Sequence, residues 1–173
     1  MGRLWHLLAH HRHRGREFQP RFQASQIAFS WLGGLLAIAT LGGLTVAIHL
    51  PLVAAPLGAS TVLLFGFPGS PLAQPRNVIL GNTLAAVVSV LCVAWLGTSP
   101  WVMGLAVGTT IALGQRCRCL HPPAGAVALL GVLLHARPLY VLVPILSGSV
   151  LLVLIAFLFY GLQDGESYPH HWV

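Results

Sequence analysis

The stretch Pro56-Leu57-Gly58-Ala59 reappears later in the chain as Pro123-Ala124-Gly125-Ala126, and at the same offset Gly81 matches Gly148. Long apolar segments flank both stretches, so the register holds across three successive segments. Two copies of such a unit in a bilayer are a common build of a small channel or carrier. The alternative is chance, because apolar segments share Leu, Gly and Ala freely. We favour two structural repeats.

The composition indicates a protein whose solvent is lipid. Of its 173 residues, 56% are hydrophobic and 7% are charged, whereas a soluble domain carries roughly 25% charged residues. Three runs are long, apolar and uncharged: Ile27 to Ile48, Val78 to Gly97 and Leu139 to Leu162. Each meets the length of roughly 20 residues that a spanning helix needs. We therefore predict an all-α integral membrane protein.

Three further apolar segments are shorter, at 52–65, 100–115 and 122–134. The first and last of them occupy matching places in the two repeats, and proline stands at the start of each. At ~1.5 Å per residue, a helix of about 14 residues reaches ~21 Å, which is less than the ~30 Å of a hydrocarbon core. These two helices are therefore expected to begin inside the membrane. Short, Pro-broken segments at matching places in two halves point to a binding site.

The arginines indicate how many segments cross. If all six cross with the N-terminus inside, Arg76, Arg116 and Arg118 lie on the same side as the basic tail, and only Arg137 lies opposite. That arrangement satisfies the positive-inside rule. With three crossings per repeat, the two repeats are inverted relative to each other. The alternative has four spanning helices and two re-entrant segments, which places all four arginines outside.

The chain divides into a basic cytoplasmic tail (1–26), one transmembrane domain (repeat 1 about 27–97, repeat 2 about 98–162) and a cytoplasmic C-terminal tail (163–173). Beside a transmembrane segment, a basic tail is a topology signal rather than a nucleic-acid site. We expect a bacterial inner (plasma) membrane protein with its N-terminus in the cytoplasm. Because one chain has few helices to seal a pathway, we also expect a homo-oligomer.

The acidic residues limit the possible functions. They are Glu17, Asp164 and Glu166, so no carboxylate lies between Phe18 and Gln163. Cation carriers and proton relays commonly place Asp or Glu inside the membrane, and their absence argues against a metal-cation site. Cys117 and Cys119 resemble half of a metal site, but no second pair accompanies them. We expect neither a metal nor another cofactor.

Two motifs resemble those of the HPP family of integral membrane proteins, which is named for a His-Pro-Pro triplet. They are Gly58 to Phe65 followed by Ser70 to Asn77, and Leu120-His121-Pro122-Pro123-Ala124-Gly125-Ala126. The Tyr168-Pro169 ending is also similar, so the resemblance covers about residues 25–172. It implies a membrane protein usually described with four transmembrane helices. Members in plant plastids and cyanobacteria are linked to nitrite transport, and most bacterial members have no assigned substrate.

The starts of the two short segments form the expected binding site. A helix that begins at Pro122-Pro123 is expected to leave its early N–H groups, from Ala124 to Ala126, unpaired, and these donors with the positive helix end suit an anion. Glycine would let a ligand approach the backbone closely. The alternative is that Pro and Gly-Ala stretches only let short helices pack. The candidate residues are Pro122, Pro123, Gly125 and Ala126 in repeat 2, and Gly58, Ala59, Ser60 and Thr61 in repeat 1, where two hydroxyls add donors.

Five polar side chains complete the set of candidates. His121 either gates or hydrogen-bonds the substrate, or caps backbone groups in a loop. Arg76 either recruits an anion at a pore mouth or caps helix C-termini and snorkels. Gln74 and Asn77 belong to the same elaborate loop. Asn82 is a polar residue within an apolar segment that is expected to lie in the membrane, so we expect it to face a partner helix or the pore.

Three functional hypotheses follow. The leading one is a transporter or channel for a small inorganic anion, for which nitrite is the candidate. The second is a membrane scaffold that transports nothing, which a dry, fully packed interior around His121 and Ser60 would favour, whereas a wet polar cavity would favour transport. The third is a membrane enzyme, for which Ser60 and His121 are the only candidate pair, and nothing in the sequence places them within hydrogen-bond distance. We therefore expect no enzyme.

Overall fold

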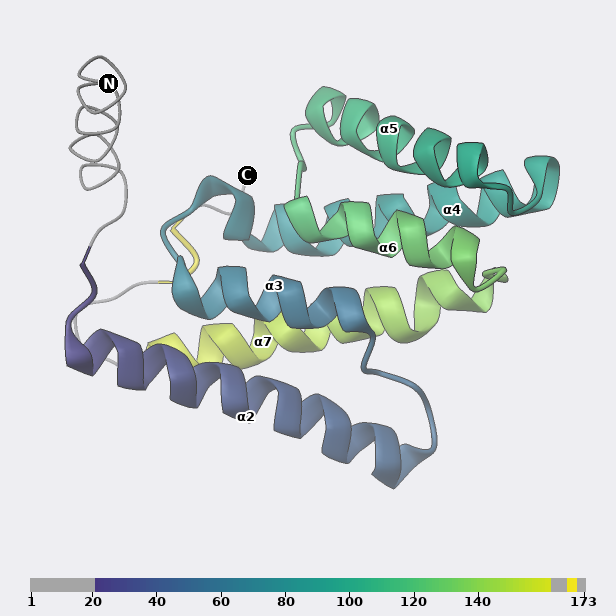
Figure 1. The fold of residues 1–173 in the computed structure, drawn as a ribbon. Helices are drawn as coiled ribbons and strands as arrows, with labels where there is room; N and C mark the ends of the chain where they lie inside the picture. The colour runs from purple at the N-terminus through teal and green to yellow at the C-terminus, as the bar shows by residue number, and fades with distance from the viewer. Residues whose placement is uncertain (1–20, 163–167, 171–173) are drawn as a thin grey trace, which may run out of the picture. The chain divides into compact units, whose positions relative to one another are not determined.

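The computed structural model describes residues 21–162 and 168–170, and the regular structure in these ranges is helical. The α-helices are α2 (Ala24–Ile48), α3 (Ala55–Gly66), α4 (Asn82–Leu96), α5 (Pro100–Arg116), α6 (Pro122–Leu133) and α7 (Ser147–Gly161) (Figure 1). A short 3-10 turn, η1 (Pro71–Ala73), follows α3, and the π-helical turns η2 (Asn77–Gly81) and η3 (Val141–Leu146) lead into α4 and α7. The predicted all-α fold of six apolar segments is confirmed.

Three helical stretches are long and apolar enough to cross a membrane: Ala24–Ile48, Asn77–Leu96 and Val141–Gly161. The helices α3 and α6 are shorter apolar helices, as predicted. Pro122 and Pro123 occupy the first positions of α6, where a missing N–H group costs nothing. Pro56 has the corresponding role near the start of α3.

The two repeats are visible in the burial pattern. The helices α3 and α6 have the same length, and the offset that aligns Pro56 with Pro123 also aligns their first residues. Every buried position of α3 has a buried counterpart in α6 at this offset. The buried residues are Pro56, Leu57, Ser60, Thr61, Leu64 and Phe65 in α3, and Pro123, Ala124, Val127, Ala128, Gly131 and Val132 in α6. Figure 1 shows α3 and α6 running in opposite directions, as inverted repeats require.

The connections between helices gather at opposite ends of the fold. At one end, Arg76 contacts the Cys117 carbonyl at 3.0 Å and Asn77 contacts the Leu120 carbonyl at 2.7 Å. Toward the other end, Thr98 Oγ1 lies 3.1 Å from His135 Nε2. Figure 1 shows that α3 ends on the side where η1 lies and that α6 ends on the side of the 134–140 connection. Each short helix therefore begins near one end of the fold and ends toward the other, as a crossing segment does. This supports six crossings rather than two re-entrant segments.

Equivalent glycines interlock the two repeats. A Cβ atom at Gly81 would lie 2.6 Å from the Cys119 carbonyl oxygen, and one at Gly148 would lie 2.6 Å from the Leu52 carbonyl oxygen. Leu52 and Cys119 are themselves equivalent positions, because the repeat offset aligns them as it aligns the two glycines. Each glycine therefore lets the chain that precedes the short helix of the opposite repeat approach closely.

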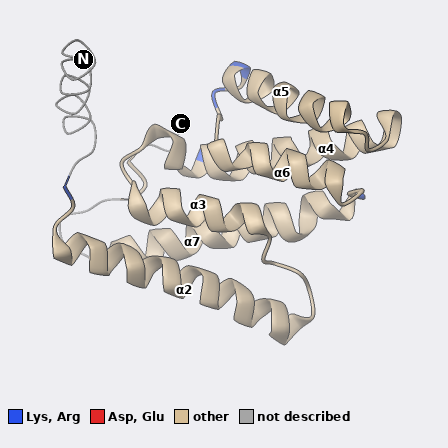
Figure 2. Ribbon diagram, viewed as in Figure 1, with Lys and Arg blue, Asp and Glu red and all other residues tan. Residues whose placement is uncertain are grey.

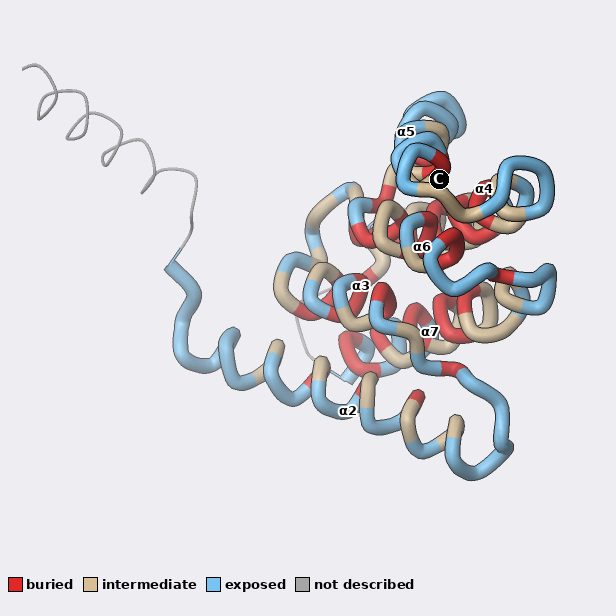
Figure 3. Tube along the Cα trace, turned by 45° about the vertical axis from the view of Figure 1, so that its right-hand side comes forward, coloured by how far each residue is buried: buried red, intermediate tan, exposed pale blue. Residues whose placement is uncertain are grey.

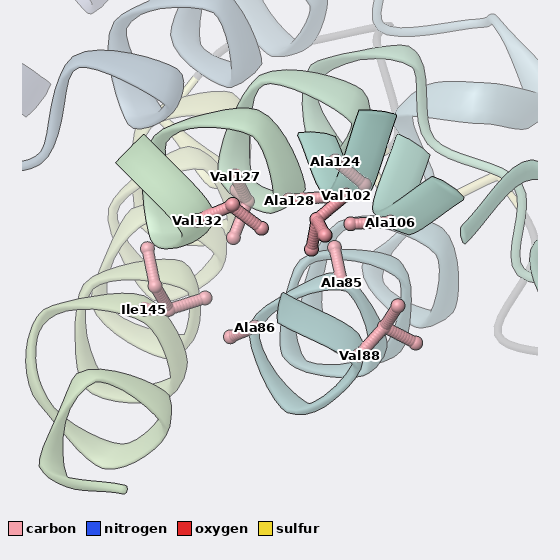
Figure 4. Close-up of a cluster of buried hydrophobic side chains, with 10 residues drawn as sticks. All are labelled: Ala85, Ala86, Val88, Val102, Ala106, Ala124, Val127, Ala128, Val132 and Ile145. Carbon is pink, nitrogen blue, oxygen red and sulfur yellow. The ribbon is translucent and has the colours of Figure 1, made fainter. Parts of the chain in front are cut away.

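Small side chains allow α4, α5, α6 and η3 to pack closely (Figure 4). The cluster consists of Ala85, Ala86, Val88, Val102, Ala106, Ala124, Val127, Ala128, Val132 and Ile145. In a bilayer, helices gain little from leaving lipid, so close van der Waals contact between small residues holds them together.

The outer faces of the helices are apolar and exposed, and the buried residues face inward (Figure 3). Trp95, Trp101 and Leu139 are more than 60% exposed. A soluble protein rarely shows so much apolar surface, so these faces suit lipid. Figure 2 shows the arginines of the described ranges at helix ends, and no Asp or Glu lies within those ranges.

The glycines of α2 differ from one another in what surrounds them. Gly33 is buried, and a Cβ there would clash with the rings of Phe65 and Phe159. Around Gly42 and Gly43, the corresponding space is open. The expected homo-oligomer stays a prediction.

Candidate functional site

His121 directly precedes α6 and is 2% exposed. Its Nδ1 lies 2.8 Å from the Leu72 carbonyl oxygen, which only accepts, so Nδ1 carries the hydrogen. In a neutral ring, Nε2 then accepts a hydrogen bond from Ser60 Oγ, at 2.8 Å. The start of α6 also disfavours the charged ring, because the positive end of the helix dipole lies there. Both ring nitrogens are therefore engaged within the protein.

Asn82 connects the two repeats. Its side-chain nitrogen donates to Ser60 Oγ at 3.3 Å and to Ser149 Oγ at 3.2 Å. The repeat offset aligns Asn82 with Ser149, so the second bond joins equivalent positions of the two repeats. All three side chains are fully buried, and Asn82 Oδ1 has no hydrogen-bond partner. We call Ser60, Asn82, His121 and Ser149 the polar cluster.

The polar cluster lies where the two short helices meet. Ser60 is in the first half of α3 and His121 caps α6, so the bond between them brings the N-terminal halves of both helices together. This is the geometry expected from Pro-initiated helices that begin inside the fold. Because α3 and α6 run in opposite directions, their dipoles are antiparallel, and only the start of α6, at His121, lies at the polar cluster with its positive end.

The predicted row of unpaired N–H groups is wrong. In an α-helix, only the cap residue and the first three helical residues lack an intrahelical partner for their N–H groups. In α6 those helical residues are Pro122 and Pro123, which have no N–H, and Ala124, which donates to the His121 carbonyl at 2.9 Å. The start of α3 repeats this bond, from the Leu57 N–H to the Ala54 carbonyl at 2.8 Å.

The hydroxyls predicted as extra donors are also occupied. Thr61 Oγ1 donates to the carbonyl of Leu57 in its own helix at 2.8 Å, and Ser60 donates to His121. Gly58 and Gly125 are partly buried, with open space at Gly58. Ala59 is exposed and Ala126 is partly buried, and an alanine side chain makes no hydrogen bond.

Side chains of the loop around Arg76 form hydrogen bonds with the segment that directly precedes His121. Arg76 donates to the Cys117 carbonyl at the C-terminal end of α5, where a cation complements the helix dipole. Asn77 donates to the Leu120 carbonyl. The Gln74 side chain donates to the Pro68 and Ser70 carbonyls. These contacts support the capping interpretation of Arg76.

The described part of the C-terminal tail contacts the same loop. Tyr168 is 5% exposed, and its hydroxyl donates to the Ala73 carbonyl at 3.0 Å. The His170 N–H donates to the Gln74 side chain at 3.0 Å. Burial raises the pKa of Tyr168, and the nearby Tyr160 adds to the increase. The tail thus holds the residues next to Leu72, whose carbonyl positions His121.

A cavity of about 370 Å³ lies between α5 and α6. It is lined by Gly81, Val107, Thr110, Ile111, Gly114, Cys119, Leu120, His121, Pro122, Ala124 and Gly125. Thr110 is 4% exposed, and its hydroxyl has no hydrogen-bond partner. His121 of the polar cluster and Thr110, whose buried hydroxyl group has no partner, therefore line the same cavity.

The structure thus brings His121, Ser60 and Asn82 together and places Arg76, Asn77 and Gln74 in the supporting loop. Sequence reasoning missed Ser149 and Thr110. Ser149 could have been found, because it is the polar residue that the repeat offset aligns with Asn82. Within the described ranges, no three His, Cys, Asp or Glu residues gather as metal ligands.

The family described as "HPP, transmembrane region" matches residues 19–169. The chain is also similar to two transmembrane proteins of Dictyostelium discoideum. It is 38% identical to one over 91% of its own length and 34% identical to the other over 92%. The chain spans 60% and 55% of the length of these relatives. No solved structure matches it. The chain belongs to the HPP family of transmembrane proteins, and this is consistent with a membrane transporter in general.

Proposed function

We propose that this HPP-family protein transports a small inorganic anion, with nitrite as the first candidate. The observation that carries the proposal is the buried polar cluster shared by the two repeats beside the cavity. A hydrogen-bonded cluster of four polar side chains is costly inside a membrane protein and marks a functional site by default. Inverted repeats commonly place a solute site at their interface, where broken helices begin.

The charge distribution supports an anion. The positive end of the α6 dipole lies at His121 of the polar cluster, and Arg76, Arg116 and Arg118 lie near the chain that leads to His121. No carboxylate lies within the described ranges. Such a field raises the local concentration of anions at the end of the fold where the cavity lies. The hydrogen bonds at the helix starts leave the N–H groups unavailable as ligands, so the support for an anion comes from the field of the α6 dipole and the arginines.

The scaffold hypothesis expects a dry, packed interior around His121 and Ser60. Ser60 is fully buried, but His121 lines the 370 Å³ cavity. A cavity of that size is in the range of ligand sites, which occupy roughly 300–1,000 Å³. The space at His121 argues against a fully packed interior, although its mostly apolar lining is not the wet polar cavity that would favour transport.

The test is nitrite uptake into proteoliposomes. We expect uptake above that of protein-free vesicles, and a fall of roughly tenfold or more for His121→Ala. That variant removes two hydrogen bonds worth about 1 kcal/mol each. His49→Asn is the matched control, because His49 is exposed and has a φ of 54°, which asparagine tolerates. Uptake by a folded wild-type protein no faster than in protein-free vesicles would reject the proposal.

A second candidate function rests on one distance. Ser60 Oγ and His121 Nε2 are 2.8 Å apart, as a nucleophile and its general base would be. The other ring nitrogen bonds a backbone carbonyl rather than a carboxylate, and Ser60 is fully buried, so we propose that the protein is not an enzyme. Labelling of Ser60 by a fluorophosphonate probe, lost in Ser60→Ala, would contradict this.

We further propose that the end of the fold that carries Arg76 faces the cytoplasm, in a bacterial inner membrane. Arg76, Arg116 and Arg118 share that end, and Arg137 lies in the connection at the other, as the positive-inside rule favours. The check is labelling of introduced cysteines by an impermeant thiol reagent in intact cells, in a variant without Cys92, Cys117 and Cys119. A cysteine at Arg137 should react and one at Arg118 should not, since both positions are exposed in the structure.

A further inference from the structure

The residues that line the cavity between α5 and α6 carry little charge. Of its lining residues in the described ranges, none is Arg, Asp or Glu, and the chain contains no Lys. Its titratable lining groups are His121 and Cys119. The nearby Arg76 guanidinium is directed to the Cys117 carbonyl at 3.0 Å. A bare anion among these lining residues would contact no counter-ion, which is costly inside a membrane.

Among the described residues that line the cavity, the uncommitted polar side chain is Thr110. Its hydroxyl is buried and has no hydrogen-bond partner, whereas both nitrogens of His121 are already engaged. A hydroxyl group donates one hydrogen bond and accepts others. Its complement is a ligand that carries one donor and one acceptor side by side and has no net charge.

We infer that the cavity binds its solute as a neutral weak acid, such as nitrous or formic acid, on the Thr110 hydroxyl. This inference rests on the proposed transport function and names the form of the solute that passes. The anion takes a proton from water on one side. The acid O–H donates to Thr110 Oγ1, and the other acid oxygen accepts from the Thr110 O–H. On the far side the acid releases its proton to water, so each solute moves with one proton and no net charge.

The arginine-rich end and the cavity then have separate roles. The positive field near Arg76, Arg116 and Arg118 attracts the anion, which is the abundant form at neutral pH. The apolar cavity admits the solute only with its proton. Anions of strong acids, such as nitrate and chloride, are excluded because their neutral acids are far rarer in neutral water than nitrous or formic acid.

The experiment uses proteoliposomes of the full chain with a pH-sensitive dye inside and a membrane potential set by potassium and valinomycin. The rate in protein-free vesicles is subtracted throughout, because small neutral acids also cross lipid. We expect nitrite and formate to acidify the interior at a rate that does not depend on the potential, and nitrate and chloride not to move. Thr110→Val should slow nitrite roughly fivefold, for the loss of about 1 kcal/mol of hydrogen bonding, and Thr110→Ser should restore it.

Thr109→Val is the control for Thr110→Val, because Thr109 is the neighbouring residue of the same helix and does not line the cavity. Nitrite uptake that follows the potential without acidification overturns the inference and leaves the transport function standing. Nitrate moving as fast as nitrite, or an unchanged rate in Thr110→Val, also overturns it. If neither nitrite nor formate moves faster than in protein-free vesicles, the transport function and the inference fall together.

Discussion

The helices α3 and α6 begin with the same backbone and with different chemistry. In both, the third helical residue donates to the residue before the helix, from Leu57 to Ala54 and from Ala124 to His121. Yet repeat 1 has alanine at the cap position where repeat 2 has histidine. The duplicated backbone thus supplies the framework, and unequal side chains at equivalent positions supply the site. The same contrast holds between Asn82 and Ser149, which pair with each other.

The largest effect is expected where the two repeats are most alike. Gly81→Ala and Gly148→Ala each place a methyl group 2.6 Å from a backbone carbonyl oxygen of the opposite repeat. Because backbone cannot yield as a flexible side chain does, each variant should lose about 3 kcal/mol of stability, the upper part of the range for overpacking.

The measurement is the fraction of monodisperse protein that survives heating in detergent. Gly108→Ala is the control, since no atom lies within 4 Å of its added methyl group. If only one of the two glycine variants is destabilised, the interlock of the repeats is not symmetric.

A smaller loss is expected for Asn82→Ala. The variant removes the Asn82 donor from both Ser149 Oγ and Ser60 Oγ, and leaves a small void in a fully buried place. Two lost hydrogen bonds and the void should cost about 2 kcal/mol together. The same heating assay measures it, with Thr83→Ala as control, because the Thr83 hydroxyl donates to Ile79 in the adjoining turn rather than to the other repeat. Equal losses in the two variants would mean that the contact between repeats adds nothing.

Tyr168→Phe tests the hydrogen bond from the C-terminal tail to the Ala73 carbonyl, next to Leu72, whose carbonyl contacts His121 of repeat 2. The variant keeps the ring contact with Tyr160 and loses the bond to the Ala73 carbonyl, for about 1 kcal/mol. The raised pKa of Tyr168 means that the unfolded chain loses its proton first, near pH 10. Its contribution to stability is therefore complete below about pH 10 and falls as the pH rises further.

Thermal stability measured at pH 8 and pH 10.5 should thus fall more in the wild type than in Tyr168→Phe. The two proteins declining in parallel would show that the Tyr168 hydroxyl is not protected by burial.

The smallest effect is expected for Ser149→Ala. It removes one of the two acceptors of Asn82 and leaves Ser60 and His121 in place. Hydrogen bonds between helices in membranes average roughly 0.6 kcal/mol. We expect that loss in the heating assay and nitrite uptake within about twofold of the wild type. A collapse of uptake would show that Ser149 itself contacts the solute.

Much of the fold could be predicted because its signals are local. Apolar run length and proline position placed the start of α3 close to where it lies, with Leu52 expected and Ala55 observed. The constant offset between matching motifs predicted the repeats, and the buried positions of α3 and α6 obey it. The predictions for the tails at 1–20, 163–167 and 171–173 lie outside the described residues.

The site was harder because side-chain pairing depends on how helices pack. Ser60 and His121 are far apart in the sequence, and no local pattern encodes their 2.8 Å contact. The prediction of unpaired N–H groups was wrong for a different reason, which is the identity of the first residues of α6. Two prolines and one bonded N–H, at Ala124, leave little at the start of α6 to bind a ligand. Thr110 belongs to no sequence motif and was identified only because it lines the cavity.

The interlocked glycines also bear on how the protein is made. While only the first half has left the ribosome, Gly81 lacks the Cys119 carbonyl that packs on it, and Leu52 lacks Gly148. Neither half completes its own packing, so folding must await insertion of the second half into the bilayer. By the same logic, fragments 1–98 and 99–173, made as separate chains, should recognise each other and assemble, since the cut falls in the short turn between α4 and α5.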